Sequence, residues 1–139
     1  MRIALAQMNP VVGDLRGNVD RALDQYARAI ELGADLVVFG ELGICGYPPE
    51  DLLLKPRFVG DVATALERFA AGIGSCPAVI GTVTGTPGSL LNSAALVRNG
   101  SVVGVYDKRD LPNYAVFDER RYFRSGDAPL ELFEVAGVN

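Results

Sequence analysis

The sequence predicts an α/β fold, because stretches with the period of a strand alternate with stretches with the period of a helix. Three observations support this prediction: a strand–helix–strand pattern in residues 2–40, a second helix between apolar runs, and an Asn99-Gly100 pair between two strand-like segments. At 139 residues the chain has the length of about one domain with its own core. It contains no repeat, linker or low-complexity tract, so we expect a single domain over residues 1–139.

The first elements predict a βαβ unit. The alternating segment RIALAQM at residues 2–8 is typical of a strand, and the short apolar run at 35–40 of a strand buried on both faces. Between them, apolar residues recur at helical spacing, and Gly33 is expected to end that helix. The stripe consists of Val19, Ala22, Leu23, Tyr26, Ala27 and Ile30. This order indicates parallel strands with a right-handed crossover.

The second half predicts one helix and an antiparallel hairpin. A loop with a short helical turn leads to a helix at 56–71, which begins at Pro56, a residue suited to the first helical position. Its apolar side would carry Phe58, Val62, Leu66 and Phe69. A strand at 77–84 follows, then a hairpin at 90–108 that turns at Asn99-Gly100, and a last strand at 129–135. An apolar terminal strand needs a neighbour, so we expect a partner or a longer natural protein.

Composition excludes several classes of function. A formal net charge of -4 without a basic block argues against a nucleic-acid partner. No apolar run reaches about 18 residues, so no membrane partner is expected. The chain has no histidine, which excludes a Ser-His-Asp triad and histidine-bound zinc, and we expect no metal site. Its two cysteines, Cys45 and Cys76, are too few for a disulfide framework, so we expect a cytoplasmic protein.

Candidate chemical groups lie where strands end. Glu41 directly follows the strand at 35–40, and ligands of open α/β sheets bind beyond such strand ends; a cap is the alternative role. Lys108 ends the hairpin, where an isolated lysine is more often a surface residue. Because both residues lie at strand ends that face one side, we expect the side chains of Glu41 and Lys108 to approach to roughly 3–7 Å. Glu119 follows in an aromatic stretch that we expect to pack inward and to bring Glu119 and Lys108 with it. Its aromatic residues are Tyr114, Phe117, Tyr122 and Phe123.

Two other features have simpler interpretations. Cys45 lies four residues after Glu41, and a Glu–Cys pair could form a nucleophile. A small loop cysteine is more often an apolar packing residue, so we interpret Cys45 as structural. The glycine-rich segment at 81–88 lacks the Gly-Lys-Ser/Thr ending of a phosphate-binding loop, and we interpret it as a strand end and turn.

Three long motifs resemble the nitrilase (carbon–nitrogen hydrolase) superfamily, and within it the glutaminase domains of glutamine-dependent NAD synthetases. They are ALAQMNPVVGDLRGNV, ELGICGYPPEDLLLKPRFV and YDKRDLPNYAVFDERRYF, and the resemblance runs from Ile3 to about Gly126. It implies that residues 1–139 are the N-terminal portion of one such domain, with no second domain in the chain. The implied fold is the first half of a nitrilase-like α-β-β-α four-layer sandwich.

The resemblance also implies roles for four residues. Glu41 matches the family's general base, and Lys108 matches the lysine that stabilises the tetrahedral intermediate. Glu119 matches a second glutamate that orients the lysine and the substrate, and Tyr114 a tyrosine of the glutamine pocket. The family's nucleophilic cysteine comes from a later segment, so we expect the 139 residues alone to be inactive.

The implied substrate is L-glutamine, and the implied partners are the rest of the glutaminase domain and a synthetase domain, in a homo-oligomer. No cofactor is expected in this segment, whereas ATP and magnesium are implied for the synthetase domain, which amidates deamido-NAD. Two alternatives stay open: another amidase of the superfamily, and a non-catalytic interaction module.

Overall fold

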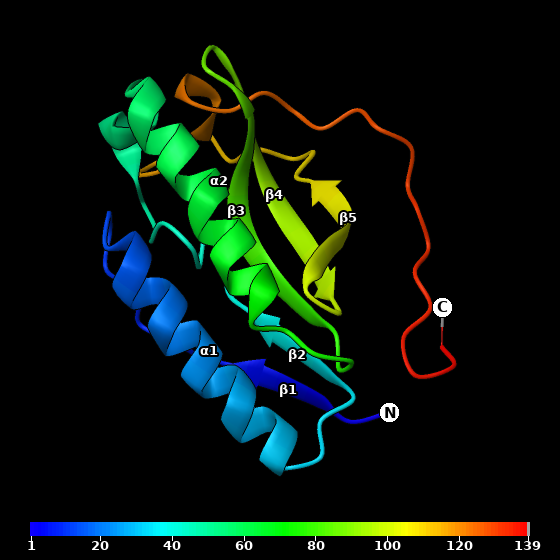
Figure 1. Cartoon of the computed structure of the whole chain (residues 1–139). Coiled ribbons are helices and arrows are strands. Elements are labelled where there is room, and N and C mark those ends of the chain that lie inside the picture. The colour runs from blue at the N-terminus through cyan, green and yellow to red at the C-terminus, as the bar shows by residue number, and fades with distance from the viewer. Residues whose placement is uncertain (139) are drawn as a thin grey trace.

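A computed structural model describes residues 1–138, which form one mixed sheet and two long helices (Figure 1). The predicted α/β class is confirmed. In chain order the elements are β1 (Ile3–Ala6), α1 (Leu15–Glu31), β2 (Leu36–Phe39), the 3₁₀ turn η1 (Glu50–Leu54), α2 (Pro56–Ala71), β3 (Ala78–Thr86), β4 (Ser89–Arg98), β5 (Ser101–Asp107) and the 3₁₀ turn η2 (Glu119–Arg121).

The five strands lie in the sheet in sequence order. β1, β2 and β3 are parallel, which confirms the predicted βαβ unit, and β3, β4 and β5 are antiparallel. The β4–β5 turn is at Asn99-Gly100, where φ is 51° and 79°, as a two-residue hairpin turn requires. The glycine-rich segment at 81–88 is strand and turn, as predicted.

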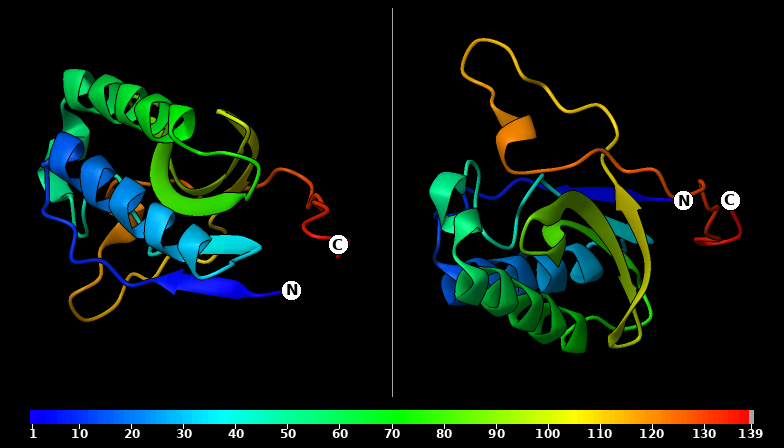
Figure 2. Two further views of the ribbon diagram at one scale, coloured as in Figure 1. Left: turned by 60° about the horizontal axis from the view of Figure 1, so that its bottom comes forward. Right: turned by 90° about the horizontal axis from the view of Figure 1, so that it is seen from above.

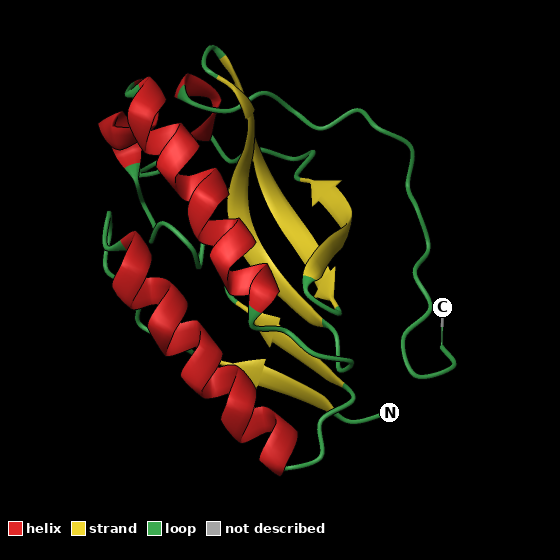
Figure 3. Ribbon diagram, viewed as in Figure 1, coloured by secondary structure: helices red, strands yellow, loops and turns green. Residues whose placement is uncertain are grey.

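Both long helices cover the same face of the sheet, so the described residues form one helical layer and one sheet layer (Figure 3, and left view of Figure 2). On β1, Ala6 points toward the helices and is 9% exposed. Ile3 and Leu5 point the other way and are 47% and 78% exposed. The opposite face of the sheet therefore presents apolar side chains. No helix among residues 1–138 has the length and hydropathy needed to cross a membrane.

Helix α1 begins and ends at the residues whose chemistry favours a boundary. The Asp14 side chain accepts a hydrogen bond from the Gly17 N–H at 3.0 Å and so caps the first turn. That hydrogen bond, together with Arg21, lowers the pKa of Asp14. At the other end Gly33 has φ 73°, and its N–H bonds to the carbonyl of Ile30, which completes the predicted glycine cap.

The buried face of α1 is rotated relative to the predicted apolar stripe. Val19, Ala22 and Tyr26 are buried as predicted, but Ala27 and Ile30 are exposed. Ala29 and the polar Asn18 are buried in their place. Residues 18, 19, 22, 26 and 29 share the helix face that packs on α2 and the sheet, so small size and hydrogen bonding decided the contact there, not hydropathy alone.

Helix α2 has the predicted bounds, and it contributes the largest fully buried side chain. Phe69 is 0% exposed and packs edge-to-face on Phe39 of β2, with ring centroids 5.5 Å apart. Val62 is also fully buried, whereas Phe58 and Leu66 are half-buried. This packing fixes β2, and with it the loop that follows β2.

The predicted last strand at 129–135 is wrong. The segment makes no ladder with the sheet, and Leu130 and Leu132 are 69% and 85% exposed. An extended segment becomes a strand only when a neighbour accepts and donates its backbone hydrogen bonds. Here the ring of Phe133 lies over Gly104 of β5, and the backbone runs along the sheet edge without pairing (Figure 1).

Candidate active site

Glu41 lies in a turn that directly follows β2 and is attached to β3. The Gly81 N–H donates to the Gly40 carbonyl at 3.2 Å, and the Ile44 N–H donates to the Gly81 carbonyl at 3.2 Å. A Cβ at position 81 would collide with the backbone of Glu41 and Leu42, so glycine permits this close approach. Leu42 has φ 48° and is 0% exposed, so burial offsets a strained conformation. The turn thereby holds Glu41 at the carboxyl edge of the sheet.

Lys108 directly follows β5, and its backbone is fixed on both sides. Its N–H donates to the Asn92 carbonyl at 2.8 Å, and its carbonyl accepts from the Gly126 N–H at 2.9 Å. The first of these bonds continues the β4–β5 pairing one residue beyond the strand. The lysine side chain therefore leaves the sheet at the same edge as Glu41.

The structure brings Glu41, Lys108 and Glu119 together. The Lys108 Nζ lies 2.8 Å from Glu41 Oε1 and 2.9 Å from Glu119 Oε1. The predicted convergence of Glu41 and Lys108 is confirmed. Glu119 is 5% exposed, so the expectation that it lies inside the protein is also confirmed. The Lys108 ammonium thus connects the carboxylates of Glu41 and Glu119, which lie 78 residues apart in the sequence.

The charges in this cluster keep the lysine protonated. Burial is the largest single influence on Lys108 and by itself lowers its pKa. The hydrogen bonds and charges of Glu41 and Glu119 together outweigh burial, so the pKa of Lys108 is raised. Lys108 is therefore a hydrogen-bond donor and not a base. Two of its three N–H bonds point to the carboxylates, which leaves one for another acceptor.

Asn92 on β4 belongs to the same cluster, and the sequence analysis missed it. Its Nδ2 donates to Glu41 Oε1 at 2.6 Å, and Asn92 is 3% exposed. The sequence feature that could have identified Asn92 is its position inside the apolar run LLNSAALV, because an asparagine buried in a strand needs hydrogen-bond partners. Which partners it finds depends on the β3–β4 register, where Asn92 lies opposite Val83.

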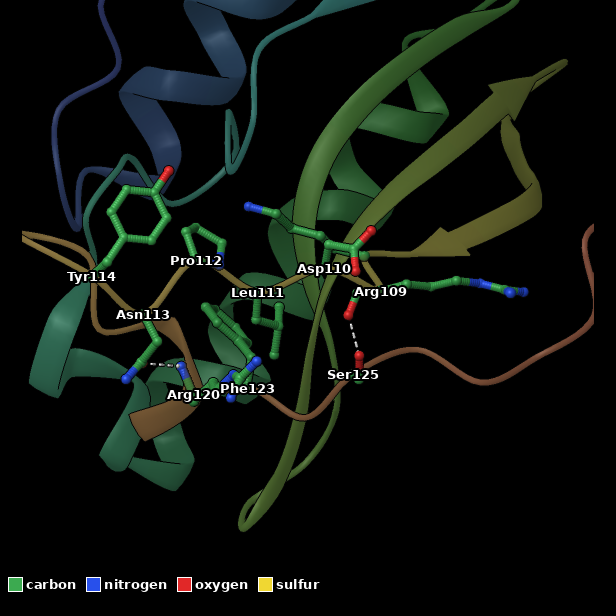
Figure 4. Close-up of a pocket in the computed structure, with 10 residues that line it drawn as sticks. Arg109, Asp110, Leu111, Pro112, Asn113, Tyr114, Arg120, Phe123 and Ser125 are labelled. Carbon is green, nitrogen blue, oxygen red and sulfur yellow. Dashed lines mark hydrogen bonds between the residues drawn. The ribbon is translucent and has the colours of Figure 1, made fainter.

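Tyr114 lies in the wall of a pocket that Lys108 also lines. The pocket has a volume of about 910 Å³, and Arg120 and Phe123 contribute to its lining (Figure 4). The expectation that the aromatic stretch packs inward holds for Phe123, at 6% exposed, but is wrong for Tyr114, at 68% exposed. Tyr114 packs edge-to-face on Phe117, with centroids 5.6 Å apart, because no described element covers this loop.

Cys45 is 0% exposed, which supports its interpretation as a structural residue. Burial raises the pKa of its thiol to about 12, so the thiolate needed for nucleophilic attack is scarce near neutral pH. Cys76 is half-buried, its pKa is raised by burial, and its Sγ lies 3.2 Å from the Ala34 carbonyl. Neither cysteine has the low pKa that is typical of a catalytic thiol.

Comparison with known sequences finds relatives with one shared activity. The sequence model of the carbon-nitrogen hydrolase family matches residues 2–139. The glutamine-dependent NAD(+) synthetase of Xanthomonas campestris is 48% identical over 124 residues, which are 88% of this chain and 22% of that protein. The corresponding enzyme of Thermotoga maritima is 42% identical over 131 residues, 94% of this chain and 23% of that protein. The chain thus spans about a quarter of these relatives and matches their N-terminal part.

Solved structures share the fold. The glutamine-dependent NAD+ synthetase from Acinetobacter baumannii superposes with a TM-score of 0.85 at 39% identity, over 97% of this chain and 26% of that one. An amidase from Nesterenkonia superposes with a TM-score of 0.83 at 27% identity, over 99% of this chain and 54% of that one. In one structure of that amidase, acrylamide has added to the active-site cysteine.

Proposed function

This chain belongs to the carbon-nitrogen hydrolase family, and we propose that it is the N-terminal part of a glutaminase domain, which hydrolyses L-glutamine and supplies ammonia for the amidation of deamido-NAD. The shared Lys108 ammonium between Glu41 and Glu119 is the observation that supports this proposal. The relatives at 48% and 42% identity, which are glutamine-dependent NAD(+) synthetases, favour glutamine as the substrate.

In the proposed reaction, a cysteine outside this chain attacks the side-chain amide carbon of glutamine. Its thiol proton passes to the Glu41 carboxylate, which acts as general base. The carbonyl π electrons move to oxygen, and the third N–H of Lys108 donates to the oxyanion. The intermediate collapses, the C–N bond breaks, and Glu41 returns the proton to the leaving nitrogen. The products of this step are ammonia and a thioester.

The second half of the reaction uses the same groups. Glu41 takes a proton from water, whose oxygen attacks the thioester carbon, and Lys108 again donates to the oxyanion. When the C–S bond breaks, the thiolate takes back the proton and glutamate is released. Glu119 keeps the ammonium of Lys108 in place, because its buried carboxylate oxygen lies 2.9 Å from Nζ. Tyr114 would contact the substrate, as the family resemblance implies; it lines a pocket together with Lys108, whereas Glu41 and Glu119 do not line that pocket.

Other properties of the whole protein form part of the proposal. ATP and magnesium would act in the synthetase part, and residues 1–138 contain no cluster of three His, Cys, Asp or Glu side chains that could hold a metal ion. The rest of the glutaminase domain would cover the apolar sheet face that exposes Ile3 and Leu5. We propose a cytoplasmic homo-oligomer, and we expect the 139-residue chain alone to be inactive because its buried Cys45 cannot replace the missing nucleophile.

The test is Glu41→Gln in the full natural protein. Glutamine-dependent NAD formation should fall by at least about 100-fold, because a general base contributes about 10²–10⁴-fold. NAD formation from added ammonium salt should be unchanged, because that route bypasses glutamine hydrolysis. Equal loss of both activities, or loss of neither, would overturn the proposal.

The likeness to the Nesterenkonia amidase favours one second candidate, an amidase that acts on small amides. Ammonia release from glutamine and from propionamide by the same preparation separates the two functions. A preference for propionamide would favour the second candidate.

A further inference from the structure

We propose that Asn92 is a positioning residue for the glutamine hydrolysis proposed above. It holds the Glu41 carboxylate by one oxygen, Oε1, so that the other oxygen, Oε2, is the one that takes the thiol proton. The inference rests on the proposed function and concerns how the general base is oriented. It assigns a role to a sheet residue that contacts the cluster but is not one of its three charged residues.

The hydrogen bonds around Asn92 form a closed ring. The Lys108 N–H donates to the Asn92 main-chain carbonyl at 2.8 Å, and the Asn92 Nδ2 donates to Glu41 Oε1 at 2.6 Å. The Lys108 Nζ donates to the same Oε1 at 2.8 Å and closes the ring. Asn92 therefore sets the position of the base and of the oxyanion donor relative to each other.

Both recorded hydrogen bonds to the Glu41 carboxylate end on Oε1. A carboxylate oxygen has two lone-pair sites, so the amide of Asn92 and the ammonium of Lys108 use both sites on Oε1. Within residues 1–138, Oε2 accepts no hydrogen bond. The side chain of Glu41 is 45% exposed, so Oε2 can reach a reacting group. The ring thereby selects one oxygen of the base.

Without Asn92, the half-exposed Glu41 side chain would depend on Lys108 alone. A glutamate side chain has several rotatable bonds, and one flexible partner does not restrict them to a single conformation. Asn92 is rigid by comparison, because it is 3% exposed and lies in the middle of a strand paired on both sides. Small displacements of a catalytic group are costly, about 100-fold for about 1 Å.

Asn18 provides a matched control, because it is the other buried asparagine among residues 1–138. Its amide donates to the carbonyls of Val11 and Ile44 at 2.8 and 3.0 Å, and its Oδ1 accepts from the Val11 N–H at 2.8 Å. These backbone partners link the α1 entry loop to the loop after β2, and Oδ1 also accepts from the Arg21 guanidinium at 2.6 Å. Asn18 therefore holds loops together and makes no contact with Glu41.

The experiment is a double-mutant cycle in the full natural protein. Asn92→Ala should lower kcat for glutamine by about 10- to 100-fold, with KM changed less than about twofold. Ammonium-dependent NAD formation should be unchanged. When Glu41→Gln is already present, adding Asn92→Ala should lower the remaining kcat by less than about twofold, because Asn92 acts only through the Glu41 carboxylate. Asn18→Ala should lower Tm but leave kcat of the folded enzyme unchanged.

Asn92→Asp is a second variant for the case in which Asn92→Ala does not fold, since aspartate keeps the shape of the asparagine side chain. It removes the donor and places a like charge beside Glu41, so kcat should fall at least as far as in Asn92→Ala. This inference alone would be overturned if Asn92→Ala lowered kcat by the same factor in the natural protein and in the Glu41→Gln variant. An unchanged kcat in Asn92→Asp would overturn it as well. Full glutamine activity in Glu41→Gln would overturn the proposed function and this inference with it.

Discussion

The core between the two helices and the sheet differs from the loop at 108–123 in how it holds buried groups. In the core, Phe69 and Val37 are 0% exposed and are held by apolar contact. In the loop, the buried carboxylate of Glu119 is held by the ammonium of Lys108 at 2.9 Å. Apolar contact is non-directional and contributes mainly to stability, whereas a buried ion pair has a specific geometry and contributes little net stability.

Because the two regions are held by different forces, stability and activity should be separable in this protein. Substitutions between α2 and the sheet should lower the free energy of unfolding without changing the proposed glutaminase activity of the folded whole protein. Substitutions in the charged cluster should remove activity, with stability effects that a second substitution can reverse.

Phe69→Ala should have the largest effect on stability. The ring is fully buried against Phe39, so its removal should lower the free energy of unfolding by about 3–5 kcal/mol. Urea unfolding of the natural protein measures this change, with the half-buried Phe58→Ala as a milder control. Glutaminase activity per folded molecule should be retained, and a specific loss of kcat in Phe69→Ala would break the separation.

Lys108→Met should have the largest effect on activity. Loss of an oxyanion donor typically costs about 100- to 1,000-fold in kcat, or about 2.7–4 kcal/mol. The substitution also leaves Glu119, whose side chain is 6% exposed, without its counter-charge, so Tm should fall. Ammonia release and thermal unfolding measure the two effects.

The double variant Lys108→Met/Glu119→Gln sharpens that prediction. Removing the buried charge should restore most of the lost Tm, while kcat should stay low because no donor returns. Recovery of activity together with stability would contradict a direct role for Lys108 in the reaction.

Cys45 should affect stability moderately and activity little. Its pKa of about 12 leaves only about one thiolate in 1,000 at pH 9, so raising the pH from 7 to 9 should not make it react with a thiol reagent. Cys45→Ser should cost about 1–3 kcal/mol, because a hydroxyl replaces a buried thiol. Most glutaminase activity should remain in the natural protein, and complete loss with the fold intact would identify Cys45 as catalytic.

The smallest effect should come from the exposed ion pair of Arg121 and Asp51. Their side chains are 54% and 66% exposed, and the Arg121 Nη2 lies 3.1 Å from the Asp51 carboxylate. Arg121→Ala should change the free energy of unfolding by less than about 1 kcal/mol, and added salt should remove the difference. Unfolding at low and high salt tests this, and a larger, salt-independent loss would contradict the small contribution expected of an exposed ion pair.

Elements whose sequence signals act on their own backbone could be predicted without the structure. Pro56 and Gly33 specify helix boundaries, and Asn99-Gly100 specifies a two-residue turn, because each restricts or permits particular φ values wherever the chain goes. The position of Glu41 after a buried strand, and the motifs around Lys108 and Glu119, indicated the candidate site. Their convergence followed from sheet topology and could be predicted.

Three further features of the site and its surroundings could be known only from the packed structure. Asn92 reaches Glu41 because of the strand register, the segment at 129–135 is not a strand because its backbone finds no partner, and Tyr114 is exposed because no described element covers its loop. Asn18 and Asn92 carry the same side chain, yet one links loops and the other holds a carboxylate. A hydrogen bond depends on the position of both partners, and the second partner is placed by packing far away in the chain.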